Sequence, residues 1–157
     1  MIKIRKAKLH DIRELLELWQ CLMDYHQALD ANQLPLKKNA KTLMEPFFTK
    51  NIRGKDSLVL VAEEDKKLVG YLMGFVRNIP PVYIEDKMAY ISDGFVIKEY
   101  RNKSIMKKMI EESKSFFRNK KMKHIYLMAD TTNKKGLISW KRIGFKEECK
   151  EMYMKLK

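Results

Sequence analysis

The stretch from Ile91 to Met106, ISDGFVIKEYRNKSIM, contains the residues best suited to bind an anion. An apolar strand ends there, and a short basic loop with Arg101 and Lys103 leads into a helix. The first turn of a helix leaves about four backbone N–H groups unpaired and carries a partial positive charge, so it can bind a phosphate. This junction therefore predicts a site for a ligand that carries phosphate groups.

Two segments of the chain resemble motifs of the GNAT superfamily of N-acetyltransferases. The segment EYRNKSIMKKMIEES is similar to the family pattern Arg/Gln-x-x-Gly-x-Gly/Ala, and Asn133 followed by WKRIGFKEE is similar to its Tyr-x-x-x-Gly-Phe pattern. The order of strands and helices also matches across roughly residues 57–156. The resemblance implies an enzyme that transfers an acetyl group from acetyl-coenzyme A (acetyl-CoA) to an amine, by direct attack of the amine on the thioester.

The resemblance also implies which residues contact the acetyl donor. Backbone groups of Phe95, Val96 and Ile97 would pair with the pantetheine arm, and a backbone N–H where the strand bulges, near Phe95 and Val96, would stabilise the oxyanion. Asn133 would form a hydrogen bond near the thioester, and Trp140 would lie close to the sulfur. The pyrophosphate would lie against the loop formed by Arg101, Asn102, Lys103, Ser104, Ile105 and Met106.

Three positions depart from the family pattern. Ser104 and Met106 stand where the family has glycines, which let the backbone approach the phosphates closely. Serine keeps the N–H group, whereas Met106 should weaken binding unless its flexible side chain turns into the core. Trp140 stands where the family has a tyrosine that acts as the general acid. Its indole can donate a hydrogen bond but cannot supply a proton to a thiolate.

Transfer to an amine requires the free base, which is on the order of one molecule in a thousand at pH 7 for an alkyl amine. Asp93 is the carboxylate best placed to act as a general base, although it could equally pair with a lysine or cap a loop. Tyr83, Glu85 and Asp86 lie in the preceding loop, where they could bind a cationic amine or simply be solvated. The three histidines lack metal-ligand spacing, so no metal is expected.

The composition indicates one globular domain over residues 1–157, with 45% apolar and 34% charged residues. No apolar run reaches the roughly 20 residues of a membrane span, and two distant cysteines favour a reducing compartment, so we expect a soluble, cytoplasmic protein. The net charge of +13 suits an anionic ligand better than a nucleic acid, because the lysines are dispersed and lack interleaved aromatics. Small-molecule or peptide amines are the expected partners, and a homodimer is compatible with the sequence.

Two other functions remain open at this point. The departures at positions 104, 106 and 140 would also suit a degenerate domain that binds coenzyme A or a partner protein without turnover. The charge leaves a nucleic-acid-binding protein as a weaker alternative, which a steep salt dependence of affinity would reveal.

The periodicity predicts the order β-α-α-β-β-β-α-β-α-β. This order is typical of an α/β (α+β) fold with a mixed, mostly antiparallel central sheet flanked by helices. One helix should begin at Asp11, with Glu14 completing a capping box, and another should cover residues 40–52 with a break or kink near Pro46. Two further helices are predicted at 104–118 and 133–142, and strands at 2–5, 57–63, 68–77, 88–97, 124–129 and 147–156.

Overall fold

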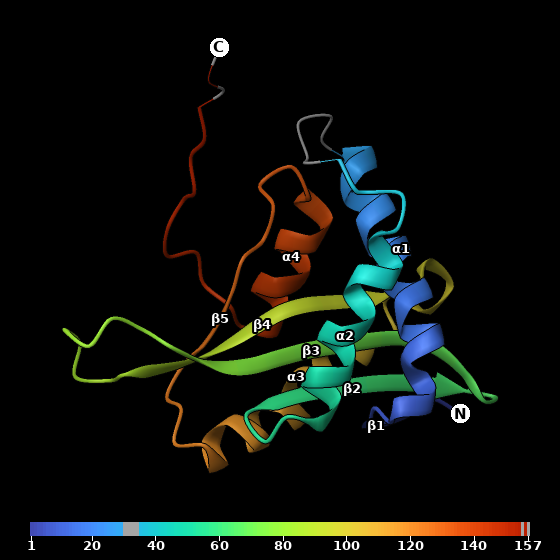
Figure 1. Ribbon diagram of the computed structural model, residues 1–157, viewed down its shortest axis with the longest axis horizontal. Helices are drawn as coiled ribbons and strands as arrows, with labels where there is room; N and C mark the ends of the chain where they lie inside the picture. The colour runs from blue at the N-terminus through green and yellow to red at the C-terminus, as the bar shows by residue number, and fades with distance from the viewer. Residues whose placement is uncertain (30–34, 155, 157) are drawn as a thin grey trace.

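Apolar residues on the long central strands give the sheet two buried faces. The structure, a computed structural model, describes residues 1–29, 35–154 and 156. Its strands are β1 (Lys3–Lys6), β2 (Ser57–Glu64), β3 (Lys67–Asn78), β4 (Lys87–Val96) and β5 (Ile125–Leu127). The helices are α1 (Ile12–Leu29), α2 (Ala40–Arg53), α3 (Ile105–Asn119) and α4 (Lys134–Ile143), with short 3-10 turns η1 (Leu9–Asp11) and η2 (Lys98–Tyr100) (Figure 1).

The strands lie in the sheet in the same order as in the sequence, from β1 to β5. Neighbouring strands are antiparallel except for β4 and β5, which run parallel. The parallel pair requires a crossover connection, and helix α3 provides it. The predicted mixed, mostly antiparallel sheet with flanking helices is therefore confirmed.

Helices cover both faces of the sheet. Helices α1 and α2 pack on one face, where Phe48 and Tyr71 are the largest fully buried side chains. Helix α3 packs on the other face through Met109 and Phe117, and α4 adds partly buried apolar residues there. Helix α1 therefore lies on one face of the sheet at β4, and the start of α3 lies on the opposite face.

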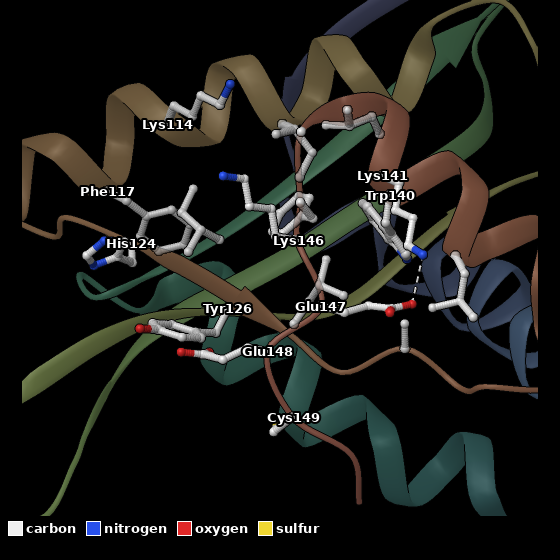
Figure 2. Close-up of a pocket in the computed structure, with 18 of the residues that line it drawn as sticks. Lys114, Phe117, His124, Tyr126, Trp140, Lys141, Lys146, Glu147, Glu148 and Cys149 are labelled. Atoms are coloured by element: carbon white, nitrogen blue, oxygen red, sulfur yellow. Dashed lines mark ion pairs between the residues drawn. The ribbon is translucent and has the colours of Figure 1, made fainter.

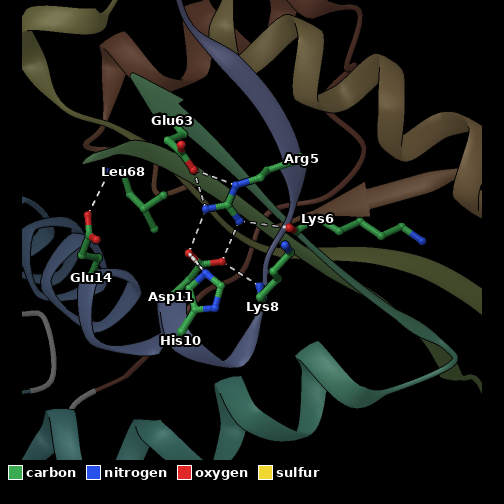
Figure 3. A network of polar contacts seen from close by, with 8 residues as sticks. All are labelled: Arg5, Lys6, Lys8, His10, Asp11, Glu14, Glu63 and Leu68. Carbon is green, nitrogen blue, oxygen red and sulfur yellow. Dashed lines mark hydrogen bonds and ion pairs between the residues drawn. The ribbon is translucent and has the colours of Figure 1, made fainter. Parts of the chain in front are cut away.

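Asp11 does not act as the predicted helix cap. Its side chain is only 4% exposed and lies at the centre of a polar network (Figure 3). The Arg5 guanidinium donates to both carboxylate oxygens at 2.7 and 2.9 Å, and the Lys8 N–H donates at 2.6 Å. Glu14 accepts instead from the Leu68 N–H at 2.9 Å. A bidentate pair with arginine is stronger than a single cap bond, so the predicted capping box is replaced by a link between α1 and the sheet.

Helix α2 continues through Pro46, so of the predicted break or kink the break does not occur. Proline removes one backbone hydrogen bond from a helix interior and crowds the preceding turn. The packing of Ala40 and Phe48, on either side of the proline, against the core keeps the two halves in one helix.

The predicted strand over residues 147–156 is wrong for the part that the structure describes. This segment follows α4 as irregular chain and runs away from the sheet (Figure 1). Five of the six residues from Lys146 to Glu151 are charged, and such residues are poor strand formers. Met152, Tyr153 and Met154 then form one apolar run instead of an alternating pattern, so no single face of a strand could bury them.

Candidate active site

The sheet opens between β4 and β5. These strands pair only where Ala89–Ile91 meets Ile125–Leu127, while β4 continues to Val96 beside β3 alone. The Ile97 N–H donates to the Val69 carbonyl at 3.0 Å, which fixes the direction of alternate backbone groups. The backbone groups of Gly94 and Val96 therefore face away from β3, towards the open edge. Those of Phe95 and Ile97 face β3, so of the three residues expected to pair with the pantetheine arm only Val96 is directed to this edge. An extended ligand can pair with this edge as an additional strand would.

Arg101 lies along the same edge. Its Nε donates to the Val96 carbonyl at 3.0 Å, and its guanidinium lies 5.3 Å from the Tyr25 ring centre and 5.7 Å from that of Phe95. The side chain is thus directed back along β4 towards α1. This placement puts a permanent positive charge next to the open backbone edge.

The bulge in β4 occurs at Ser92, not near Phe95 and Val96 as expected. Met73 pairs with Asp93 and Gly74 with Ile91, so Ser92 is the additional residue. Gly74 permits this irregularity, because a Cβ there would lie only 2.9 Å from the Tyr90 carbonyl oxygen. Bulges redirect neighbouring side chains, and this one places Asp93 on the face covered by α1.

Asp93 lies in an environment that suits a general base. It is half-buried, and burial raises the pKa of its carboxyl above the ordinary value, while the Ser92 hydroxyl and His26 oppose the rise. The Tyr71 hydroxyl is fully buried nearby and has no hydrogen-bond partner within the described chain. Burial and the charge of Asp93 raise the pKa of Tyr71 well above its ordinary value. Asp93 and the Tyr71 hydroxyl are thus two polar groups on the otherwise apolar face of the sheet that α1 covers.

The loop before α3 has a backbone shaped for close approach. Asn102 and Ser104 both adopt the left-handed conformation, with φ of 65° and 58°. The Lys108 N–H donates to the Ser104 carbonyl at 3.0 Å and closes the first helical turn. The N–H groups of residues 105–107 therefore have no acceptor in their own helix and point out of its end. These N–H groups could bind an anion as a ligand, and the predicted anion-binding junction stays a prediction.

The Met106 side chain turns into the core, which is the condition under which it would not weaken ligand binding. Its Cε lies 3.1 Å from where a Cβ on Gly94 would be, and the Trp140 ring lies 3.2 Å from the same point. Both side chains use the space that the glycine leaves above β4. Met106 is thus kept away from the loop, and the sequence departure at 106 does not fill the anion site.

Replacing Ser104 by glycine should stabilise the protein. A side chain in the left-handed region costs roughly 1–2 kcal/mol, and glycine does not have this cost. We expect a gain of about 1 kcal/mol and a rise in melting temperature of about 2–4 °C, measured by thermal unfolding. An unchanged or lower melting temperature would show that the serine conformation is not strained.

Asn133 and Trp140 lie at the other wall of the opening. The Asn133 side chain caps α4 by accepting the Gly136 N–H at 2.9 Å, and it also accepts the Tyr25 hydroxyl at 3.2 Å. Trp140 packs edge-on against Phe145 with ring centres 5.6 Å apart. Tyr25 therefore links α1 to the start of α4 beside the opening between β4 and β5.

Tyr25, His26 and Tyr71 are site residues that sequence reasoning missed. His26 lies 3.9 Å from Asp130, and it faces the same region as Asp93. Its position on the apolar row of α1 was a visible signal, but such a histidine is usually a core residue. Tyr25 and Tyr71 gave no signal, since an aromatic residue in an amphipathic helix or strand looks like ordinary packing.

The loop between β3 and β4 is not brought together with Asp93. Tyr83, Glu85 and Asp86 lie at the opposite end of β4, about 20 Å along the strand from Asp93. Glu85 forms an ion pair with Lys123 at 2.7 Å, which lowers the pKa of its carboxyl. The placement favours the solvated alternative for these three residues.

A separate cavity of about 1040 Å³ lies beyond β5, between α3, α4 and the irregular C-terminal segment (Figure 2). Tyr126 and Trp140 line it together with Lys114, and a Lys141–Glu147 ion pair of 2.9 Å crosses one side. The cavity exists because residues 147–154 do not pair with the outer edge of β5. It is distinct from the open edge of β4.

The family profile described as "Acetyltransferase (GNAT) family" matches residues 14–145. The chain belongs to the GNAT acetyltransferase family. It is an acyltransferase by family, and its fold agrees with that assignment.

Related proteins extend the comparison. An N-alpha-acetyltransferase from Sulfurisphaera tokodaii is 26% identical over 134 residues, which cover 80% of this chain and 77% of that protein. The crystal structure of a mutant protein from Bacillus halodurans is similar with a TM-score of 0.87 and 22% identity, over 98% and 99% of the two chains. A predicted acetyltransferase from Clostridium acetobutylicum, solved with acetyl-CoA, has a TM-score of 0.80 and 19% identity over 99% and 96%.

The part of this GNAT chain that the structure describes contains no helix both long and apolar enough to cross a bilayer.

Proposed function

We propose that this protein transfers the acetyl group of acetyl-CoA to a primary amine, and that the amine attacks the thioester directly. The proposal rests chiefly on one observation: the backbone edge of β4, at Gly94 and the Val96 N–H, has no strand beside it and leads directly to the unpaired N–H groups of α3. An extended pantetheine arm suits the first feature, and a pyrophosphate suits the second. The Clostridium acetobutylicum relative, solved with acetyl-CoA, supports this choice of donor.

The remaining residues provide the chemistry of transfer in this proposal. Asp93 accepts the proton that the amine loses, directly or through water. The Val96 N–H, which faces the open edge, donates to the oxygen that becomes negative as the amine attacks. Asn133 holds the thioester end of the donor from α4. The carboxylate of Asp93 also attracts a cationic acceptor in a protein whose net charge is +13.

The proposed acceptor is the free amine of a peptide or a small molecule. The relative from Sulfurisphaera tokodaii is named an N-alpha-acetyltransferase. An Acinetobacter baumannii structure with a TM-score of 0.77 and 17% identity is an aminoglycoside 6'-N-acetyltransferase. A panel with a short peptide bearing a free α-amine, free lysine, spermidine and an aminoglycoside would separate these classes.

Donor binding can be tested by thermal unfolding. A ligand at 100 times its dissociation constant adds about 2.7 kcal/mol of stability, which corresponds to roughly 5–11 °C here. We expect acetyl-CoA to give such a shift, and Arg101→Ala to lose most of it, because the guanidinium lies at the open edge. Arg13→Ala, on the exposed side of α1, should keep the full shift as a control. No shift at millimolar acetyl-CoA would refute the proposal.

A domain that binds coenzyme A without turnover would give the same acetyl-CoA-induced rise in melting temperature but no acetyl transfer. Consumption of the thioester in the presence of the amine panel distinguishes the two. The inward position of Met106 leaves the donor loop unobstructed, which suits acetyl-CoA binding under both alternatives.

A further inference from the structure

Tryptophan at position 140 supplies no proton for the thiolate that departs from the thioester. The thioester sulfur departs as a thiolate, and an indole N–H cannot protonate it. The ring is also fixed by packing, against Phe145 on one side and above Gly94 on the other. A phenol that reaches the same opening from another element could do what the indole cannot.

Tyr25 of α1 reaches this opening. Its hydroxyl lies 3.2 Å from Asn133 Oδ1, at the start of α4, and its ring lies 5.3 Å from the Arg101 guanidinium, which is bonded to the end of β4. The half-buried ring therefore lies between the two walls that hold the open edge. A donor bound along Val96 and held by Asn133 would place its thioester next to this hydroxyl.

We propose that the Tyr25 hydroxyl protonates the departing thiolate, an inference that rests on the proposed acetyl transfer. The amine nitrogen forms the new C–N bond and loses a proton to Asp93, while the C–S bond breaks with its electron pair on sulfur. The Tyr25 O–H proton passes to that sulfur and gives the free thiol. The phenolate then recovers a proton from water as Asp93 releases one, so the enzyme returns to its starting state.

The groups around Tyr25 suit this role. Arg101 supplies a positive charge over the ring, which stabilises the transient phenolate. The Asn133 carboxamide accepts the hydroxyl hydrogen bond before the reaction, and an anionic sulfur is the stronger acceptor once it forms. His26 lies with its ring centre 6.0 Å away on α1, paired with Asp130 at 3.9 Å, and Asp93 faces it from β4. Among the residues that the structure describes, the permanently charged Arg101 is the cation recorded over the ring of this phenol.

Tyr25→Phe tests the proposal, because it removes the hydroxyl and keeps the ring. We expect kcat to fall about 100-fold, the lower part of the range for general acids, since a thiolate is a fair leaving group. The dissociation constant for acetyl-CoA and the melting temperature should stay nearly unchanged. Tyr153→Phe, an exposed tyrosine of the C-terminal segment, is the matched control.

A second variant provides a rescue. In Tyr25→Phe, the added change Trp140→Tyr places a phenol on the opposite wall. We expect the double variant to have a kcat at least tenfold higher than that of Tyr25→Phe alone. A kcat of Tyr25→Phe within threefold of that of the unmodified protein would overturn the proposal. A weakened dissociation constant with kcat unchanged would also overturn it, since Tyr25 would then only hold the donor. Absence of any acetyl-CoA-induced shift in the unmodified protein would instead refute the proposed function.

Discussion

Asp93→Asn should lower kcat/KM at neutral pH by at least 100-fold, as expected when a general base is removed. The variant keeps the size and polarity of the side chain, so the effect would be chemical. Because the folded protein raises the pKa of Asp93, the rate of the unmodified protein should rise with pH through a range above the ordinary aspartate value. Without the base, the rate should follow the fraction of free amine and climb tenfold per pH unit towards the pKa of the acceptor.

The same substitution should not destabilise the protein at neutral pH. A carboxyl whose pKa is higher in the folded state contributes stability below its unfolded pKa and loses it as the pH rises through the folded value. At neutral pH, an ionised Asp93 is therefore unfavourable, and Asp93→Asn should have an equal or higher melting temperature. Asp65→Asn, in the exposed turn between β2 and β3, is the control and should change neither quantity. An unchanged pH–rate profile would show that Asp93 has only a structural role.

Ser104→Asp should weaken acetyl-CoA binding at least tenfold. Two like charges about 4 Å apart repel by about 1 kcal/mol in water and about 4 kcal/mol near a protein surface, and the variant places a carboxylate beside the expected pyrophosphate. The melting temperature of the unliganded protein should not fall, because aspartate tolerates the left-handed backbone and a negative charge at the start of α3 is stabilising. Titration calorimetry measures the affinity, and thermal unfolding measures the stability.

Ser104→Asn separates charge from shape in this experiment. Asparagine is nearly the same size as aspartate and also tolerates the conformation, but it is neutral. Its affinity for acetyl-CoA should lie within about threefold of the unmodified protein, since the backbone N–H groups remain available. If both variants bind acetyl-CoA as the unmodified protein does, the pyrophosphate does not lie at this loop.

The sequence by itself determined the family and most of the order of the strands and helices, and it predicted an anion-binding junction before α3. These features depend on local patterns: the periodicity of apolar residues, the basic loop before α3, and the motif near Asn133. It failed at residues 147–156, where a strand requires a partner edge and an alternating apolar face that this segment lacks. It also misplaced the bulge, because the close approach that Gly74 allows depends on the neighbouring strand.

Only the tertiary structure decided which side chains meet. Tyr25 and Asn133 are 108 positions apart in the sequence, and nothing in their local pattern relates them. The same holds for Asp93 and the buried Tyr71 hydroxyl, and for the route of Arg101 back along β4. Local sequence fixes what a segment can form, whereas burial, pKa and hydrogen-bond partners depend on the segments packed against it. For this reason the sequence could nominate Val96 and Asp93 as candidate site residues, whereas Tyr25, whose candidacy depends on Asn133 and Arg101 around it, could not be found from the sequence.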